Sequence, residues 1–277
     1  MGFANDYLAQ IERIAQHLTP PPIRALHLPP LTDGSRKWGE FCALELEDGS
    51  LGLSYVMLDD TLARLIERRT ALGIEGSDAV ALARAYGDAA PLKRTLGFAA
   101  ANAITRHLFD RAGFAPGDSE DSIGGLAPGP DDHVGMIGYF APIAGRIVAS
   151  GARLTVAELR TDLAGAQEGF EITLDPSRLA ACNKILSTST ILLNDTLDTM
   201  LGHCAAAERF AMIGPSAGCL PDALFARGVT SLGGTWITDR AGFLATLPSG
   251  ESWSRFSRKC ALTPAAYPGL DALLARA

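Results

Sequence analysis

One stretch decides the fold: His133-Val-Gly-Met-Ile-Gly-Tyr-Phe-Ala-Pro-Ile-Ala-Gly-Arg-Ile-Val-Ala-Ser-Gly151. Its apolar run 134–137 predicts a short buried strand, and Gly138 permits a sharp turn after that strand. Pro142 suits the first turn of a helix, where its missing N–H is not needed. The next segment, Arg153-Leu-Thr-Val-Ala-Glu158, predicts a second strand. Strand, helix and strand in this order indicate a βαβ unit with parallel strands.

The same alternation continues along the second half of the chain. We expect strands near 133–138, 153–158, 184–189, 209–213 and 229–235, and helices near 141–150, 196–206 and 221–227. Apolar strands between helices predict a mainly parallel sheet that is buried on both faces. The helix at 196–206 begins with Asp195-Thr-Leu-Asp198, which is similar to a capping box, and its spacing turns Cys204 toward the core.

The first half has a different order, with strands first and helices after them. The turn Asp48-Gly49-Ser50 lies between two apolar alternations and is a strong hairpin signal. The expected elements are a helix at 3–18, strands at 23–28, 41–47 and 51–57, and helices at 59–72, 78–86 and 91–109. This order predicts a small α+β domain. The segment 113–132 is rich in Gly, Pro and acids, so we place the boundary between domains 1–119 and 120–277. The residues from Cys260 onward suggest a polar loop and a short helix at 270–275.

Composition limits the class of protein. The chain has 277 residues, 47% of them hydrophobic, a net charge of −7 and a pI of about 5.2. This acidity disfavours a nucleic-acid partner, because phosphate binding needs a basic face. No apolar run reaches the length of a membrane span, and the first ten residues do not resemble a secretory signal. Five widely spaced cysteines fit free thiols in a reducing cytoplasm, so we expect a cytoplasmic protein without membrane contact.

Polar and glycine-rich turns follow the predicted strands. Ligands of parallel sheets bind at the carboxyl ends of the strands, so these turns are expected to share one rim. They are Gly138-Tyr139-Phe140, Glu158, Ser187-Thr188-Ser189-Thr190 with Asn194, Gly214-Pro215-Ser216-Ala217-Gly218, and Gly233-Gly234-Thr235. Their hydroxyls, amides and backbone N–H groups suit a polar or anionic ligand. Each turn also has a purely structural interpretation. Glu158, for example, is a candidate ribose-binding acid or a solvated surface acid.

Metal-ligand patterns are weak. His203 and Cys204 are neighbours on a helix and point apart by about 100°. Cys182 and Cys219 have no partner at zinc spacing and are more readily explained as small buried hydrophobes. The run Asp131-Asp132-His133 is more typical of a solvated linker than of a metal site. His107, on the long helix, is expected to be half-buried or exposed.

These residues resemble the family known as putative heavy-metal chelation. The resemblance rests on Val134 to Pro142, Ser187 to Asp198, Ile213 to Ser216 and Gly228 to Thr235, and more loosely on the hairpin and on Gly97 to Ala103. It implies a small domain similar to the N-terminal domain of enolase, followed by a Rossmann-like three-layer domain with a mainly parallel sheet. The family usually has Asn-Gly-Thr where this chain has Asn194-Asp195-Thr196. Asp195 is therefore expected to change the charge preference of the cleft or to cap a helix.

The resemblance also implies a ligand site in the cleft between the domains. The positions it carries over, together with the rim residue Ser189, are Asn102, Gly138, Tyr139, Phe140, Glu158, Ser189, Asn194, Thr196, Pro215, Ser216 and Thr235. The ligand would be a metal ion or a small metal-chelating molecule.

Two other functions stay open at this point. The first is a Rossmann-type enzyme that acts on a small molecule with a nucleotide or S-adenosylmethionine cofactor, although the Gly-x-Gly-x-x-Gly fingerprint is missing. The second is an assembly role, with the apolar N-terminal helix in a homodimer interface.

Overall fold

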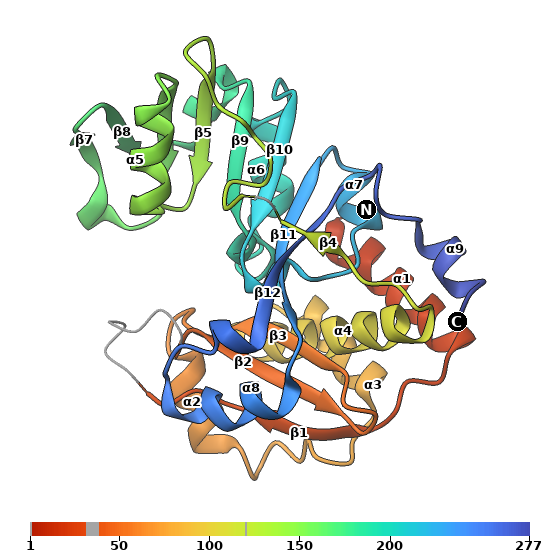
Figure 1. Cartoon of the computed structure of the whole chain (residues 1–277). Coiled ribbons are helices and arrows are strands. Elements are labelled where there is room, and N and C mark those ends of the chain that lie inside the picture. The colour runs from red at the N-terminus through yellow and green to blue at the C-terminus, as the bar shows by residue number, and fades with distance from the viewer. Residues whose placement is uncertain (1, 32–38, 120) are drawn as a thin grey trace.

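The computed structural model describes residues 2–31, 39–119 and 121–277, and it arranges them as two lobes around two sheets (Figure 1). The smaller lobe holds a three-stranded antiparallel sheet. The larger lobe holds a nine-stranded, mostly parallel sheet. This arrangement confirms the predicted α/β class, with a small α+β unit ahead of a mainly parallel sheet. No helix in the described ranges has both the length and the apolar character of a membrane span.

The smaller sheet consists of β1 (Ile23–His27), β2 (Phe41–Leu46) and β3 (Leu51–Tyr55), in that order. The predicted hairpin is confirmed, and Gly49 adopts a φ of 90° in its turn. The helix α4 (Pro91–Arg111) crosses this sheet so closely that a Cβ on Gly52 would lie 2.0 Å from the carbonyl oxygen of Ala99. The lobe is completed by α1 (Phe3–His17), α2 (Thr61–Arg68) and α3 (Ala79–Ala83).

Six parallel strands form the centre of the larger sheet. In chain order they are β5 (His133–Ile137), β6 (Arg153–Ala157), β8 (Phe170–Thr173), β9 (Lys184–Thr188), β10 (Arg209–Ile213) and β11 (Ser231–Ile237). In space they run β8-β6-β5-β9-β10-β11, which is the order 3-2-1-4-5-6 of doubly wound sheets. The winding direction reverses between β5 and β9, so a crevice is expected at the carboxyl ends of these two strands.

Helices and a packed loop cover the two faces of this sheet. On one face, α5 (Ala141–Ala149) buries Ala144 and Ile147, while α6 (Leu197–His203) and α7 (Asp222–Phe225) cover the other. Part of the segment 113–132, whose composition suggested a boundary between domains, also packs on the α5 face. Ile123 and Leu126 are buried there in the same hydrophobic cluster as Ala144 and Ile147. A Cβ on Gly124 would lie 2.6 Å from the Cβ of Ala211. This part of 113–132 is therefore a covering layer of the sheet.

The sequence analysis missed several elements and misplaced others. The predicted loop from Cys260 onward begins inside β12 (Ser257–Leu262), an antiparallel strand beside β11. Its sequence Ser-Arg-Lys-Cys-Ala-Leu carries too little apolar alternation to be recognised without that partner. The remaining elements without a prediction are β4 (Gly117–Asp118), β7 (Gly165–Gln167), β8 and α8 (Arg240–Thr246). The short helix at the end is confirmed as α9 (Leu270–Leu274).

The expected capping box at α6 is wrong. The N-cap residue is Thr196, which makes no side-chain cap bond, and the helix ends at His203 instead of residue 206. Asp198 turns instead toward the N-terminal helix, where its Oδ2 accepts a hydrogen bond from Phe3 N at 2.9 Å. Its Oδ1 lies 3.3 Å from Nε of Arg227. Cys204 is buried as predicted.

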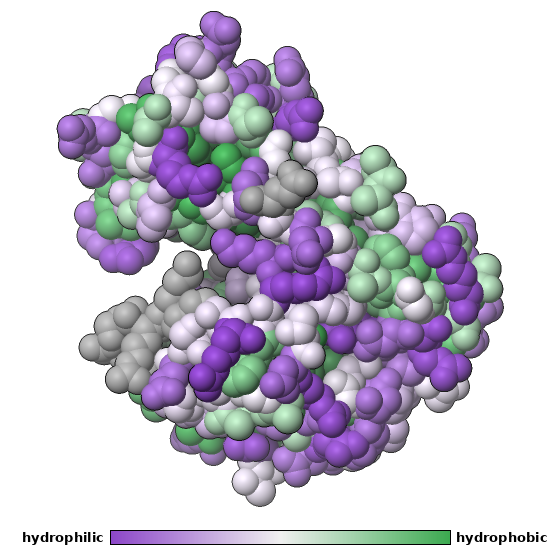
Figure 2. All heavy atoms as spheres, viewed as in Figure 1, coloured by the Kyte–Doolittle hydropathy of each residue, from purple (hydrophilic) through white to green (hydrophobic). Residues whose placement is uncertain are grey.

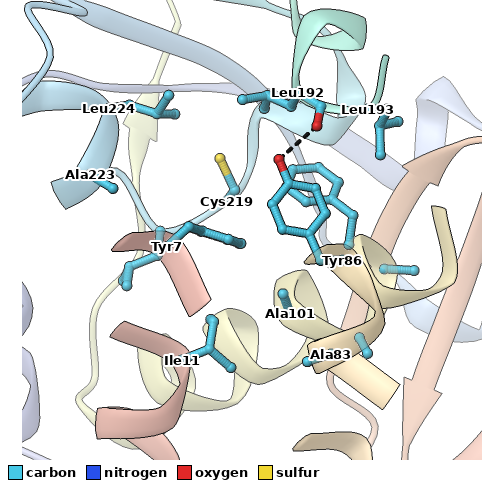
Figure 3. Close-up of a cluster of buried hydrophobic side chains, with 14 of the residues drawn as sticks. Tyr7, Ile11, Ala83, Tyr86, Ala101, Leu192, Leu193, Cys219, Ala223 and Leu224 are labelled. Atoms are coloured by element: carbon cyan, nitrogen blue, oxygen red, sulfur yellow. Dashed lines mark hydrogen bonds between the residues drawn. The ribbon is translucent and has the colours of Figure 1, made fainter. Parts of the chain in front are cut away.

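One hydrophobic core runs through both lobes (Figure 3). Tyr7 and Tyr86 from the smaller lobe pack with their ring centroids 5.6 Å apart, and Tyr86 donates a 2.6 Å hydrogen bond to the carbonyl oxygen of Leu192. Cys219 of the larger lobe lies in the same cluster. The apolar face of α1 is therefore covered by the chain itself, which removes the argument for a dimer interface on this helix.

The last third of the chain also returns to the smaller sheet. Phe243, Leu247 and Trp253 form one buried cluster with Phe41 and Leu53 of the hairpin. The helix α8 thus lies against β2 and β3, although it follows the larger sheet in the sequence (Figure 1). Buried apolar contacts therefore join the two lobes.

Candidate functional site

A cleft of about 920 Å³ opens between the two lobes. Figure 2 shows it as a notch in the surface of the molecule. Phe41, Tyr55 and Met57 line it from the smaller lobe, and the turns after the parallel strands line it from the larger lobe. A concave site of this size, with an apolar wall and a polar rim, is typical of sites for small organic ligands.

Most of the predicted site residues meet in this cleft. Those that line it are Gly138, Tyr139, Phe140, Glu158, Ser189, Asn194, Thr196 and Pro215. The other three lie elsewhere. Asn102 and Thr235 border a separate small cavity of about 30 Å³, which Pro215 also touches, and Ser216 is fully buried. The predicted set is therefore divided between the cleft and the packed layer behind it.

Close packing of glycine turns joins the ends of β5, β9 and β10. Gly138 has a φ of 80°, and a Cβ there would lie 2.9 Å from Cγ2 of Thr188. Gly214 has a φ of 141°, and its Cβ would lie 2.3 Å from Oγ of Ser189. Both positions need glycine for its backbone freedom and its lack of a side chain. The turns thus form one continuous rim, as the parallel sheet predicts.

Glu158 holds this rim in place through its carboxylate. Its Oε2 accepts a hydrogen bond from Tyr139 N at 2.9 Å. Its Oε1 accepts bonds from Leu159 N at 2.7 Å and from Arg160 N at 3.2 Å. The carboxylate therefore links the turn after β5 to the turn after β6. It is neither a free surface acid nor an open ribose acceptor.

Hydroxyl and amide groups make up the rest of the rim. Thr188 Oγ1 donates to Thr190 Oγ1 at 2.9 Å and accepts from Thr190 N at 3.2 Å. Asn194 Oδ1 accepts from the Oγ1 and the N of Thr196, at 2.6 Å and 3.3 Å. These short-range bonds fix the two turns, and side chains of this kind can both donate to and accept from a ligand.

Asp195 lies between two cleft residues but does not line the cleft. Its φ of 63° is left-handed, which explains why the resembled family usually has glycine at this position. Its carboxylate lies 3.4 Å from Nη2 of Arg94 on α4. The expectation that Asp195 caps the helix is therefore wrong, because the N-cap residue is Thr196. The expectation that it changes the charge preference of the cleft stays a prediction. The side chain contacts the smaller lobe.

Asn102 has all of its polar atoms engaged inside the protein. Its Nδ2 donates to the carbonyl oxygens of Leu53, at 2.8 Å, and Ser216, at 3.4 Å. Its Oδ1 accepts from the hydroxyl of Tyr7 at 3.2 Å. The side chain is 4% exposed. Asn102 thus connects β3, which carries Tyr55, to the turn after β10, which carries Pro215.

Sequence reasoning missed the wall that the smaller lobe contributes. Glu40, Phe41 and Tyr55 line the cleft from this lobe, and Trp253 lines it from the segment that packs on the small sheet. Lys259 lines it from β12 of the larger sheet, and none of these residues was singled out. Burial, together with the carboxylates of Glu40 and Glu158, raises the pKa of Tyr55 to about 12, so its phenol stays protonated. The hairpin pattern predicts the strands but gives no sign of which strand end faces the other lobe. The location of this wall therefore required the tertiary structure.

The metal-ligand candidates do not gather into a site. Residues 2–31, 39–119 and 121–277 contain no group of three or more His, Cys, Asp or Glu side chains placed to hold a metal ion. Burial raises the pKa of Cys182 to about 11 and that of Cys204 and Cys219 to about 12, so these thiols are protonated and behave as buried hydrophobes.

The histidine and aspartate candidates have other partners. Asp132 lies 2.8 Å from Nζ of Lys184, and Nε2 of His133 lies 2.9 Å from Oγ1 of Thr155. His107 is buried, whereas a half-buried or exposed position was expected, and its Nδ1 lies 2.6 Å from Oδ2 of Asp48. These pairs are part of the fold.

Comparison with known proteins finds matching family models and a relative. Two family models match, over residues 39–105 and 125–266, and both carry the description "Putative heavy-metal chelation". An uncharacterized protein of Methanocaldococcus jannaschii is 29% identical over 154 residues. These residues are 53% of this chain and span only 56% of that relative.

Two solved structures of proteins of unknown function share the fold. One, from Pyrococcus horikoshii, has a TM-score of 0.67 at 21% identity. The match covers 93% of this chain and 99% of the Pyrococcus chain. The other, from Desulfitobacterium hafniense, has a TM-score of 0.65 at 16% identity. The match covers 95% of this chain and 98% of the Desulfitobacterium chain. The longer family match spans just over half of the residues. The chain therefore belongs to the family described as "Putative heavy-metal chelation".

Proposed function

We propose that the cleft binds a small metal-chelating organic molecule, with or without its metal. The observation that carries this proposal is the form of the cleft, a space of about 920 Å³ with apolar side chains on one wall and a rim of hydroxyls and amides on the other. A bare ion needs several converging carboxylate, thiolate or imidazole ligands at about 2–2.5 Å. An organic chelator supplies such ligands itself and needs mainly shape, apolar contact and hydrogen bonds from the protein.

A nucleotide-dependent enzyme is the second candidate, and the strand order favours it. The crevice beside the reversal point of a doubly wound sheet is where dinucleotides bind. Glu158 ends the second parallel strand, where an acid that holds a ribose would stand. However, its carboxylate already accepts hydrogen bonds from Tyr139, Leu159 and Arg160, so it is poorly placed to accept two more from a ribose. The chelator is therefore the preferred ligand.

Equilibrium dialysis tests the proposal. Co²⁺, Ni²⁺, Cu²⁺ and Zn²⁺ are supplied either as aqueous ions or as citrate complexes, and the metal retained by the protein is measured by elemental analysis. We expect retention of at least one citrate complex and weaker retention of the aqueous ion. Tyr55→Leu and Tyr139→Leu, from opposite walls, should each weaken that retention about fivefold, which corresponds to about 1 kcal/mol of lost contact.

The matched control is Ile66→Ala, which removes an exposed apolar side chain that does not line the cleft. It should leave retention unchanged. Retention of no citrate complex, or retention that neither tyrosine substitution affects, would contradict the proposed function.

A further inference from the structure

Lys259 differs from the other lysines of the described chain. Lys93 lies 2.9 Å from a carboxylate oxygen of Asp88, and Lys184 lies 2.8 Å from one of Asp132. Lys259 makes no ion pair with any residue that the structure describes, although the protein carries 31 acidic residues against 24 Lys and Arg. Its exposed side chain lines the cleft.

The strand β12 explains why Lys259 faces this space. Cys260, its neighbour in the strand, is buried, and the alternation of side chains along a strand leaves Lys259 on the opposite face. Lys259 lies opposite Thr235 of β11 in the antiparallel ladder, beside the turn that carries Gly214. The ammonium group is therefore held at the border of the cleft by the larger sheet itself.

The other charged groups of the cleft differ from Lys259 in their surroundings. Glu158 is hydrogen-bonded by three backbone N–H groups, and Arg160 lies 2.6 Å from a carboxylate oxygen of Asp162. The carboxylates of Glu40 and Glu158 lie close enough to Tyr55 to raise its pKa. Among the charged groups of the described cleft lining, Lys259 is the one cation without an ion pair.

We propose that the ligand of this cleft carries an anionic oxygen group, a carboxylate or a phosphate, which Lys259 binds. This inference rests on the proposed function and names the chemical class of its ligand. An ammonium group that has no counter-ion among the described residues and lies at the edge of a concave site attracts oxyanions, because the field of the charge is less screened there than on an open surface. If a chelator has more acid groups than coordinate its metal, one of these groups stays free to bind Lys259.

Inert cobalt(III) complexes of opposite charge provide a direct test. The cobalt(III) complex of EDTA is an anion that presents carboxylate oxygens. The cobalt(III) complex that holds both ammonia and pyrophosphate is an anion that presents phosphate oxygens. Hexaamminecobalt(III) is a cation. Dialysis at low ionic strength measures the retention of each complex. We expect retention of an anionic complex and not of the cation. The better retained anion identifies the preferred oxygen group.

Substitutions then assign the effect to Lys259. Lys259→Gln should weaken retention of the anion about tenfold, Lys259→Arg should preserve it, and Lys93→Gln, which changes an exposed lysine outside the cleft, should have no effect. Retention of all three complexes alike, or an anion retained equally by Lys259→Gln, overturns this inference and leaves the proposed function standing. If the wild type retains none of the three cobalt(III) complexes, the inference is overturned. The dialysis with metal citrate complexes then decides separately on the proposed function.

Discussion

The backbone of Asp195 lies in the left-handed region, with a φ of 63°, between two residues of the cleft rim. This conformation costs an ordinary residue about 1 kcal/mol, and glycine avoids the cost. Here the carboxylate lies 3.4 Å from the guanidinium of Arg94, whose side chain is only 10% exposed. Asp195, which stands where the family usually has glycine, therefore adds a contact between the lobes.

Two substitutions at this position separate the backbone from the side chain. Asp195→Ala and Asp195→Gly both remove the carboxylate near Arg94, but only alanine keeps the left-handed strain. We expect the glycine variant to be more stable than the alanine variant by about 1 kcal/mol, as measured by urea denaturation. An alanine variant as stable as the glycine variant would contradict this account of the turn.

The pair of Asp48 and His107 predicts a specific dependence of stability on pH. Burial raises the pKa of Asp48, but hydrogen bonds from His107 and Ser50 outweigh burial and lower it from 3.8 to about 2. A carboxyl whose pKa is lowered by folding stabilises the protein above the pKa of the unfolded chain. That stability is lost as the pH falls from about 4 toward 2.

Asp48→Asn should therefore remove part of this acid-dependent stability. Between pH 4 and pH 2 the wild type should lose about 1 kcal/mol more of its unfolding free energy than the variant, since the carboxylate is partly exposed. Denaturant titrations at a series of pH values measure this difference. Asp60→Asn, at a carboxylate that is 68% exposed, serves as the control and should follow the wild type. If the unfolding free energy of Asp48→Asn fell between pH 4 and pH 2 as much as that of the wild type, this role for the pair would be excluded.

Local sequence patterns predicted many of the elements that surround the cleft. The hairpin around Gly49, the long α4 and the β5–α5–β6 unit follow from turn residues and apolar periodicity. The strand β12 and the packing of Ile123 and Leu126 do not, because their neighbours come from distant parts of the chain. The same limit applies to the site. The rim follows from strand ends, but Tyr55 and Lys259 reach the cleft only through tertiary packing.

Asn102 is the side chain that joins β3 of the smaller lobe to the turn after β10. Asn102→Ala leaves the buried carbonyl oxygens of Leu53 and Ser216 and the hydroxyl of Tyr7 without this partner, and should cost about 2–3 kcal/mol of unfolding free energy. Tyr7→Phe removes only one of these bonds and should cost about 1 kcal/mol.

Asn102→Asp completes this series of variants. It keeps the acceptor for Tyr7 but brings a carboxylate toward two carbonyl oxygens, so it should be less stable than Asn102→Ala. Thermal denaturation ranks the three variants. A ranking in which Asn102→Ala is as stable as Tyr7→Phe would mean that the bonds to Leu53 and Ser216 do not connect the lobes.

In the protein as a whole, two different walls face each other across the cleft. The apolar core around Tyr86 and Leu192 joins the two lobes (Figure 3), and α8 packs with the small sheet (Figure 1). Neither lobe carries the whole site. We expect a ligand with an apolar part for the wall of the smaller lobe and polar groups for the rim.

The most direct measurement is the position of a bound chelate. Crystals soaked with the cobalt(III) complex of EDTA, recorded at the cobalt absorption edge, would place the metal by its anomalous scattering. The proposed function predicts a cobalt peak inside the cleft, between Tyr55 and the turn at Gly138. The inference about Lys259 predicts in addition that a carboxylate of the complex is directed at Lys259. A saturated soak that leaves the cleft without cobalt, or that places cobalt only on the outer surface, would contradict it.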